Sequence, residues 1–266
     1  MNKPPLPKEH GAWAMLIIPL LLGWVIAPER QWRAIFLLIA TLGLFLARYP
    51  LAMWVKTRKR SKSDHAYFRR WTIIYGSIAG MSGSWLIFVH GLWGLAGLGL
   101  VGGLLLLFHL WLISRRQEMS VIGELAGICG LALGAPMAYY TATGQFDTTA
   151  GILWLINTLY FGGTVFYIKL KVRQQPRLPA PNRLSERLVK AKAGLIYQTI
   201  ALTILISLAA MQQIPYSTPI VLIPATIKMV YGAWQWQDKK SLKLPRLGVI
   251  EILHAIIFMV LVIVIF

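Results

Sequence analysis

The sequence has few charged residues, and very few of them are acidic. Only 14% of its 266 residues are charged, 57% are hydrophobic, and the mean hydropathy is +0.61. A soluble domain of this length would need far more charged surface, so the composition predicts an integral membrane protein. Asp and Glu number 9 against 27 Lys and Arg, which gives a formal net charge of +18. In a soluble chain such a charge would suggest a nucleic-acid partner.

Cysteine is almost absent. Cys129 is the single cysteine, so no intrachain disulfide is possible. Cys and His residues show no metal-type spacing, and we identify no cofactor motif. Lys3 and Lys8 precede an apolar run as in a signal peptide. Because no small-x-small cleavage site follows, we expect an uncleaved first span.

Long apolar windows are abundant instead. About 20 helical residues cross the roughly 30 Å of hydrocarbon in a bilayer. Chain breakers separate the windows, as at Pro28, Gly91, Gly144 and Pro215. We therefore predict an all-α polytopic protein, a single transmembrane domain over 1–266. Its nine spans are 9–27, 32–54, 70–90, 92–113, 120–141, 148–168, 191–211, 216–236 and 246–266.

The basic residues predict an orientation. All of the 27 except Arg30, Arg33 and Lys228 lie at the N-terminus or around the connections after spans two, four, six and eight. By the positive-inside rule, the N-terminus is cytoplasmic and the C-terminus lies outside. The charge is then mainly an orientation signal that also attracts anionic lipid head groups. Membrane lipids are thus expected partners, and nucleic acid is not.

Ionisable residues in or beside the spans are the candidates for a functional site, since a charge in hydrocarbon is costly. Glu9 and His10 enter span one, Arg48 precedes Tyr49-Pro50 in span two, and Glu124 lies in a Gly/Ala-rich part of span five. Glu9, His10 and Glu124 are the acid/base candidates, and Arg48 is the candidate clamp for an anionic head group. The structural alternative for each is an interhelical ion pair.

The later spans carry further candidates. Glu251 and His254 lie on one face of span nine, and Asn157 lies in span six. We include Glu251 and Asn157 among the substrate-binding candidates. His109 is more simply a satisfied core histidine, and Lys228 lies within snorkelling reach of the cytoplasmic face.

Spans two and six end alike. WVKTR carries Lys56 and Arg58, and YIKLK carries Lys169 and Lys171. A four-helix internal repeat would bring these ends to one cytoplasmic cavity, where the four cations would bind an anionic head group. An aromatic belt followed by basic residues also occurs at ordinary inward-facing helix ends.

PKEHGAWAM before span one, ARYPL in span two and FYIKLKVR at the end of span six resemble the YwiC-like bacterial membrane proteins. The resemblance covers the full chain and implies a bacterial cytoplasmic membrane location, but no particular activity.

A more distant resemblance, in architecture, is to the UbiA superfamily of intramembrane prenyltransferases. Those enzymes hold Mg²⁺ and a prenyl diphosphate on Asp-rich motifs after helices two and six. Neither 48–58 nor 157–171 contains an Asp here, so the Mg²⁺–diphosphate chemistry does not carry over.

Three functions stay open. The chain is an intramembrane enzyme or binder for an amphiphilic, anionic, isoprenoid- or lipid-like substrate at a basic cytoplasmic cavity. Alternatively it is a transporter or flippase with helices broken by glycine and proline, or a non-catalytic scaffold.

Overall fold

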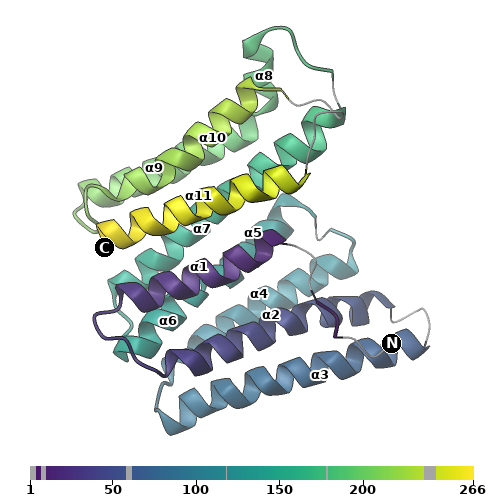
Figure 1. The fold of residues 1–266 in the computed structure, drawn as a ribbon, viewed down its shortest axis with the longest axis vertical. Helices are drawn as coiled ribbons and strands as arrows, with labels where there is room; N and C mark the ends of the chain where they lie inside the picture. Colours follow the sequence, from purple (N-terminus) through teal and green to yellow (C-terminus); the bar gives the residue numbers. More distant parts are fainter. Residues whose placement is uncertain (1–3, 7–9, 58–61, 118, 178, 237–243) are drawn as a thin grey trace. The chain divides into compact units, whose positions relative to one another are not determined.

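A computed structural model describes residues 4–6, 10–57, 62–117, 119–177, 179–236 and 244–266. These residues fold mainly into helices, with no strand among them (Figure 1). The α-helices are α1 (His10–Ile26), α2 (Ala34–Thr57), α3 (Lys62–Ser84), α4 (Gly94–Ser114), α5 (Val121–Ala132), α6 (Gly134–Thr143), α7 (Thr148–Ile168), α8 (Leu184–Lys190), α9 (Lys192–Ala210), α10 (Ile223–Trp234) and α11 (Leu244–Ile265).

Seven helical segments among the described residues are long and apolar enough to cross a membrane. They are Ala34–Lys56, His65–Val89, Gly94–Ser114, Val121–Thr143, Thr148–Arg177, Lys192–Ala210 and Pro245–Ile265. Each corresponds to a window predicted from the sequence. Their outward faces carry large apolar side chains, such as Met81 at 75% exposure and Val264 at 77%, as expected of surfaces against lipid. The chain is therefore a multi-pass helical membrane protein.

The other two predicted spans form shorter helices. Window 9–27 becomes the apolar helix Gly11–Ile26. Window 216–236 is divided into a 3₁₀ segment, Thr218–Leu222, and α10. Pro219 and Pro224 lie at the starts of these two segments, and a proline provides no N–H for the preceding turn, so one continuous helix does not form.

Two of the predicted breakers end helical segments by their backbone conformation. Gly91 has φ +69° and Gly144 has φ +70°, the left-handed region that favours glycine. Gly144 also donates its N–H to the Tyr140 carbonyl, 2.8 Å away, which closes the end of α6.

The sequence predicts one domain, and the chain forms two compact units, residues 1–155 and 156–266. In the first unit α2 lies along α3, and α1 lies along α6 (Figure 1). Glycine permits the second contact, because a Cβ at Gly23 would overlap the carbonyl of Ala135. Leu16, Leu20, Phe45 and further residues form the core of this unit.

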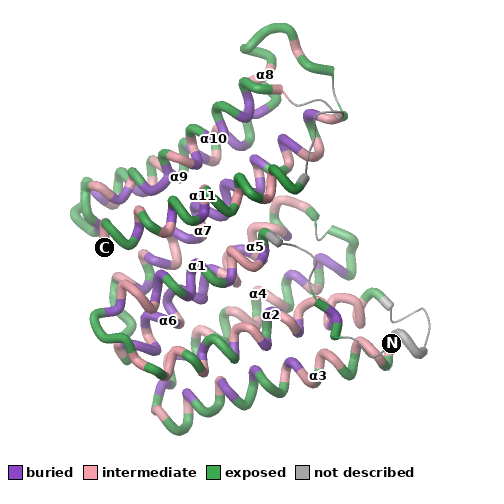
Figure 2. The backbone as a smooth tube through the Cα atoms, viewed as in Figure 1, coloured by how far each residue is buried: buried purple, intermediate pink, exposed green. Residues whose placement is uncertain are grey.

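In the second unit the end of α7 packs with α9, α10 and α11. Tyr160 of α7 stacks on Phe258 of α11, with ring centroids 3.9 Å apart. Figure 2 shows buried positions alternating with exposed ones along α9 and α11, so each presents one face to its unit and one face outward.

Candidate functional site

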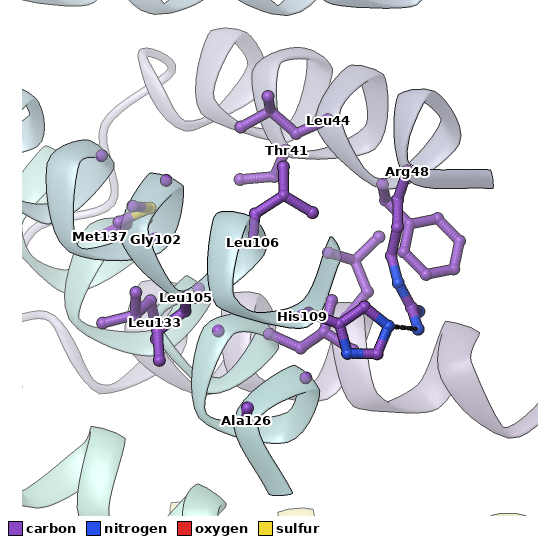
Figure 3. A pocket seen from close by; sticks show the side chains of 18 residues that line it. Thr41, Leu44, Arg48, Gly102, Leu105, Leu106, His109, Ala126, Leu133 and Met137 are labelled. Carbon is purple, nitrogen blue, oxygen red and sulfur yellow. Dashed lines mark hydrogen bonds between the residues drawn. The ribbon is translucent and has the colours of Figure 1, made fainter. Parts of the chain in front are cut away.

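Arg48 of α2 lies next to a break in its helix. Pro50 is inside α2, so the carbonyl one turn before it lacks its usual backbone N–H partner. Arg48 is half-buried, and its guanidinium reaches His109 of α4, with Nη2 3.2 Å from Nε2. Figure 3 shows the two side chains pointing toward one another.

The contacts of His109 define its tautomer. A guanidinium only donates hydrogen bonds, so Nε2 of His109 accepts the bond from Arg48. Nδ1 then carries the proton and donates it to the carbonyl of Gly123, 3.2 Å away. His109 is 5% exposed, so a buried, neutral imidazole connects the guanidinium of Arg48 to the start of α5 through two hydrogen bonds.

The start of α5 is itself held in place. Ser120 caps the helix, its Oγ accepting from the Gly123 N–H at 3.1 Å. Gly127 lies one turn on, where a Cβ would be 4.0 Å from Nδ1 of His109. A small residue at this place leaves room for the imidazole against the helix.

Arg48 and His109 lie at one end of an apolar cavity of about 200 Å³ within the first unit (Figure 3). Six glycines and six leucines form two thirds of its lining. The cavity is lined by Leu16, Thr41, Leu44, Phe45, Arg48, Gly99, Gly102, Gly103, Leu105, Leu106, His109, Ala126, Gly127, Gly130, Leu131, Leu133, Gly134 and Met137.

The glycines make this cavity. A Cβ at Gly99 or Gly103 would meet no atom within 4 Å, and one at Gly130 would make only an ordinary contact with Leu105. Packing between helices therefore does not demand glycine at these positions. Side chains there would project into space that is now open.

Arg48 is the single permanent cation in the lining. Among the described residues no carboxylate forms an ion pair with it. A neutral imidazole orients the guanidinium without neutralising it, so the charged end of the cavity is positive.

Of the site residues predicted in the first unit, some lie outside the described residues and others lie near the cavity or at a helix end. Glu9 and Arg58 lie outside the described residues, as does the side chain of His10. Glu124 is half-buried in the first turn of α5, where the helix dipole favours a carboxylate, next to the Gly123 carbonyl that receives His109. Lys56 is exposed at the end of α2.

The other predicted residues belong to the second unit. Asn157 is fully buried in α7. The helix continues past the predicted end of span six through a π-helical segment, Lys169–Gln174, in which Lys169 is half-buried. This segment turns Lys171 inward, and its Nζ donates to the Gln235 carbonyl at 2.6 Å, beside a similar bond from Gln175 to Gly232. Lys171 thus caps the end of α10.

Glu251 pairs with Lys228 of α10, and not with His254 on its own helix face. It accepts from Lys228 Nζ at 2.8 Å, and the two side chains are 12% and 5% exposed. Lys228 also lies 4.8 Å from the centre of the Tyr167 ring. The snorkelling interpretation of Lys228 is wrong, because this ion pair and the ring hold the ammonium inside the unit. His254 instead contacts the Ile250 carbonyl one turn back, at 2.9 Å.

The described residues contain no group of three or more His, Cys, Asp or Glu side chains placed to hold a metal ion. The permanent positive charge in the cavity lining is that of Arg48.

Comparison with known proteins identifies the family of the chain. The profile of the YwiC-like protein family matches residues 6–139, half of the chain. The chain belongs to the YwiC-like family. An uncharacterised relative, YwiC of Bacillus subtilis (strain 168), is 32% identical over 177 residues, which cover 64% of this chain and 68% of the relative. An uncharacterised protein of Haemophilus influenzae is 22% identical over 263 residues, 97% of each chain. No solved structure matches.

The YwiC-like segment and the cavity coincide. All residues that line the cavity, from Leu16 to Met137, lie within 6–139. PKEHGAWAM and ARYPL also lie in or at the edge of this segment, whereas FYIKLKVR follows it.

Sequence reasoning missed two parts of the site: His109 as the partner of Arg48, and the glycine wall. The run GLAGLGLVGG in α4 was the available signal for the wall. Glycine every few residues in a helix permits close packing or leaves a space, and the sequence does not distinguish these outcomes.

Proposed function

We propose that this YwiC-like protein binds an amphiphile in the cavity of its first unit. Arg48 receives the anionic group of the ligand, and the glycine and leucine wall receives its apolar part. One observation carries the proposal: a braced guanidinium, without a carboxylate partner among the described residues, lies at the end of an otherwise apolar cavity.

The physical reason is the cost of an uncompensated charge. A half-buried cation in low-dielectric surroundings gains free energy when an anion pairs with it. Arg48 is already oriented by His109, so little side-chain entropy is lost when a ligand binds. The apolar part of an amphiphile fills space that a hydrocarbon chain from the bilayer can enter.

The predicted topology implies on which side of the membrane this site lies. Nine spans require α1 and the segment Thr218–Trp234 to cross as well, and 17 residues at 1.5 Å each reach about 25 Å, close to the hydrocarbon thickness. With the N-terminus inside, α2 and α4 both run toward the cytoplasm. Arg48 and His109 then lie in the inner half of a bacterial cytoplasmic membrane.

Enzymatic use of the ligand would draw on Glu9, His10 and Glu124 as acid/base groups, in a UbiA-like bundle without its Asp-rich metal site. Lys56 and Arg58, which follow Arg48 in the sequence, are the further proposed contacts for the head group. Asn157, Lys169, Lys171 and Glu251 belong to the second unit and are not proposed as contacts in this cavity. The buried Lys228–Glu251 pair favours a second function, transport, because paired charges inside a helical unit are typical of transport pathways.

The test is native mass spectrometry of the protein purified in a neutral detergent. We expect a co-purifying amphiphile that is lost in Arg48→Gln. Arg115→Gln is the matched control, since Arg115 is exposed at the end of α4, packs over Trp111 at 4.9 Å and is outside the cavity lining. Arg48→Lys keeps the positive charge. Amphiphile retained in this variant and lost in Arg48→Gln would attribute the loss to the charge and not to misfolding. Equal amphiphile content in wild type, Arg48→Gln and Arg115→Gln would refute the proposal.

A further inference from the structure

The cavity of the first unit also indicates which kind of amphiphile it takes. We propose that the ligand is a single-chain amphiphile with one carboxylate head, such as a long-chain fatty acid. This inference rests on the proposed function and narrows it, since a phosphate or diphosphate ester would satisfy the proposed function equally.

The donor geometry at the head fits a carboxylate, and it fits a phosphate as well, so the charge of the lining has to distinguish the two. A guanidinium has five N–H donors in one plane, and His109 engages one of them, on Nη2. The remaining donors leave a two-donor edge that matches the two oxygens of a carboxylate. Nε2 of His109 has no proton in this tautomer, so it orients Arg48 and does not itself donate to the ligand.

The charge of the lining agrees with a monoanion. Arg48 is its only permanent cation, and His109 is neutral. A carboxylate and a guanidinium cancel. A phosphate ester carries a charge of about −1.5 to −2 at neutral pH, and a diphosphate carries more. The excess would stay unpaired beside leucines and glycines, and an unpaired charge in such surroundings is strongly disfavoured.

The dimensions agree with one chain. A cavity of about 200 Å³ is smaller than the roughly 300–1,000 Å³ that holds a drug-sized ligand. It is long, however: its α4 wall runs from Gly99 to His109, ten residues or about 15 Å. This volume and length match one extended hydrocarbon chain better than a diacyl lipid or a fused-ring molecule.

Two glycines of α4 provide a matched pair for the test. Gly103 lines the cavity and Gly97 does not, and a Cβ at either meets no atom within 4 Å. Gly103→Leu therefore fills the cavity, and Gly97→Leu makes the same chemical change on the same helix outside it. Both substitutions raise the helix propensity equally. A difference in ligand binding between the two variants is therefore due to filling the cavity.

The experiment is a competition measured by native mass spectrometry on delipidated protein in a neutral detergent, with and without Mg²⁺. The probes are dodecanoate, dodecyl phosphate, geranyl diphosphate and dodecanol at equal concentrations. We expect dodecanoate to bind at least tenfold more tightly than each of the other three. Gly103→Leu should weaken its binding at least tenfold, Gly97→Leu less than twofold, and Arg48→Lys should reduce the preference for carboxylate over phosphate.

The outcomes separate the two proposals. If dodecyl phosphate or geranyl diphosphate binds more tightly than dodecanoate and depends on Arg48, the carboxylate inference is wrong and the proposed function stands. Equal affinities for dodecanol and dodecanoate would show that the carboxylate head group contributes nothing to binding, and the inference would be wrong. If none of the four binds, the proposed function fails together with the inference. Equal effects of the two glycine exchanges would place the ligand elsewhere.

Discussion

At the scale of single residues, the contacts of His109 explain why a positively charged side chain can be held still inside an apolar unit. The imidazole accepts from Arg48 and donates to Gly123, so one side chain joins α2, α4 and α5. Arg48 and His109 are 61 residues apart in sequence, and their pairing depends on how two helices are rotated about their axes. No local pattern in the sequence contains that information.

His109→Leu should therefore weaken both ligand binding and stability. Leucine keeps an apolar volume but leaves the half-buried Arg48 without its acceptor, and an unsatisfied buried group costs about 1–3 kcal/mol. His109→Gln should recover part of the loss, because its amide offers one acceptor and one donor. Thermal unfolding and native mass spectrometry measure the two effects. If the glutamine variant is as poor as the leucine variant in both, the brace is not the role of His109.

The Lys228–Glu251 pair allows a second residue-scale prediction. Lys228→Met or Glu251→Met alone should destabilise the second unit by about 3–5 kcal/mol, since each leaves one partner without its counter-charge. The double variant Lys228→Met/Glu251→Met should recover most of that loss, because a buried pair is often replaceable by apolar residues. Thermal unfolding of the four proteins forms a double-mutant cycle, and additive losses would show that the pair is not coupled.

At the scale of helices, glycine has opposite roles at different positions. At Gly23 it permits the contact of α1 with α6, whereas at Gly103 it leaves space. At Gly11 a Cβ would meet nothing within 4 Å, and its neighbour Ala12 is the residue buried in the core. In the described part of the unit, the close contact at this end of α1 is therefore made by Ala12 and does not need Gly11.

Gly23→Leu should consequently prevent α1 from packing on α6. A Cβ there overlaps the Ala135 carbonyl, which is backbone and cannot move aside as a flexible side chain can. We expect a lowered melting temperature and faster proteolysis of the first unit. Gly11→Leu, on the same helix, should leave both unchanged. Equal stability of the two variants would contradict the helix contact.

Helix positions were predictable to the extent that they depend on local composition. Seven windows became membrane-length helices, and Gly91 and Gly144 end helices as predicted. The division of 216–236 at its prolines was missed, because hydropathy averages over proline. The inward turn of Lys171 was missed too, since it follows from a π-helical segment that no periodicity in the sequence indicates. The site depended most on such non-local contacts, so less of it was predicted.

At the scale of the whole molecule, the distribution of Lys and Arg remains the argument for the orientation of the chain, and through it for the side on which Arg48 lies. Ser63 follows span two and Thr143 ends α6, so nine spans place them on opposite sides of the membrane. Single cysteines at these two positions, introduced in a Cys129→Ala background, test this directly.

A membrane-impermeant maleimide added to intact cells should label Thr143→Cys, and it should label Ser63→Cys only after the membrane is opened. The physical reason is the cost of moving the basic segment KTRKRSK across the bilayer, which keeps Ser63 inside. The Cys129→Ala protein without a new cysteine gives the background, and labelling of both after lysis shows that both thiols are accessible. Labelling of the two positions from the same side would overturn the predicted topology. Arg48 would then need a new assignment to one membrane face, although its pairing with His109 inside the first unit would be unaffected.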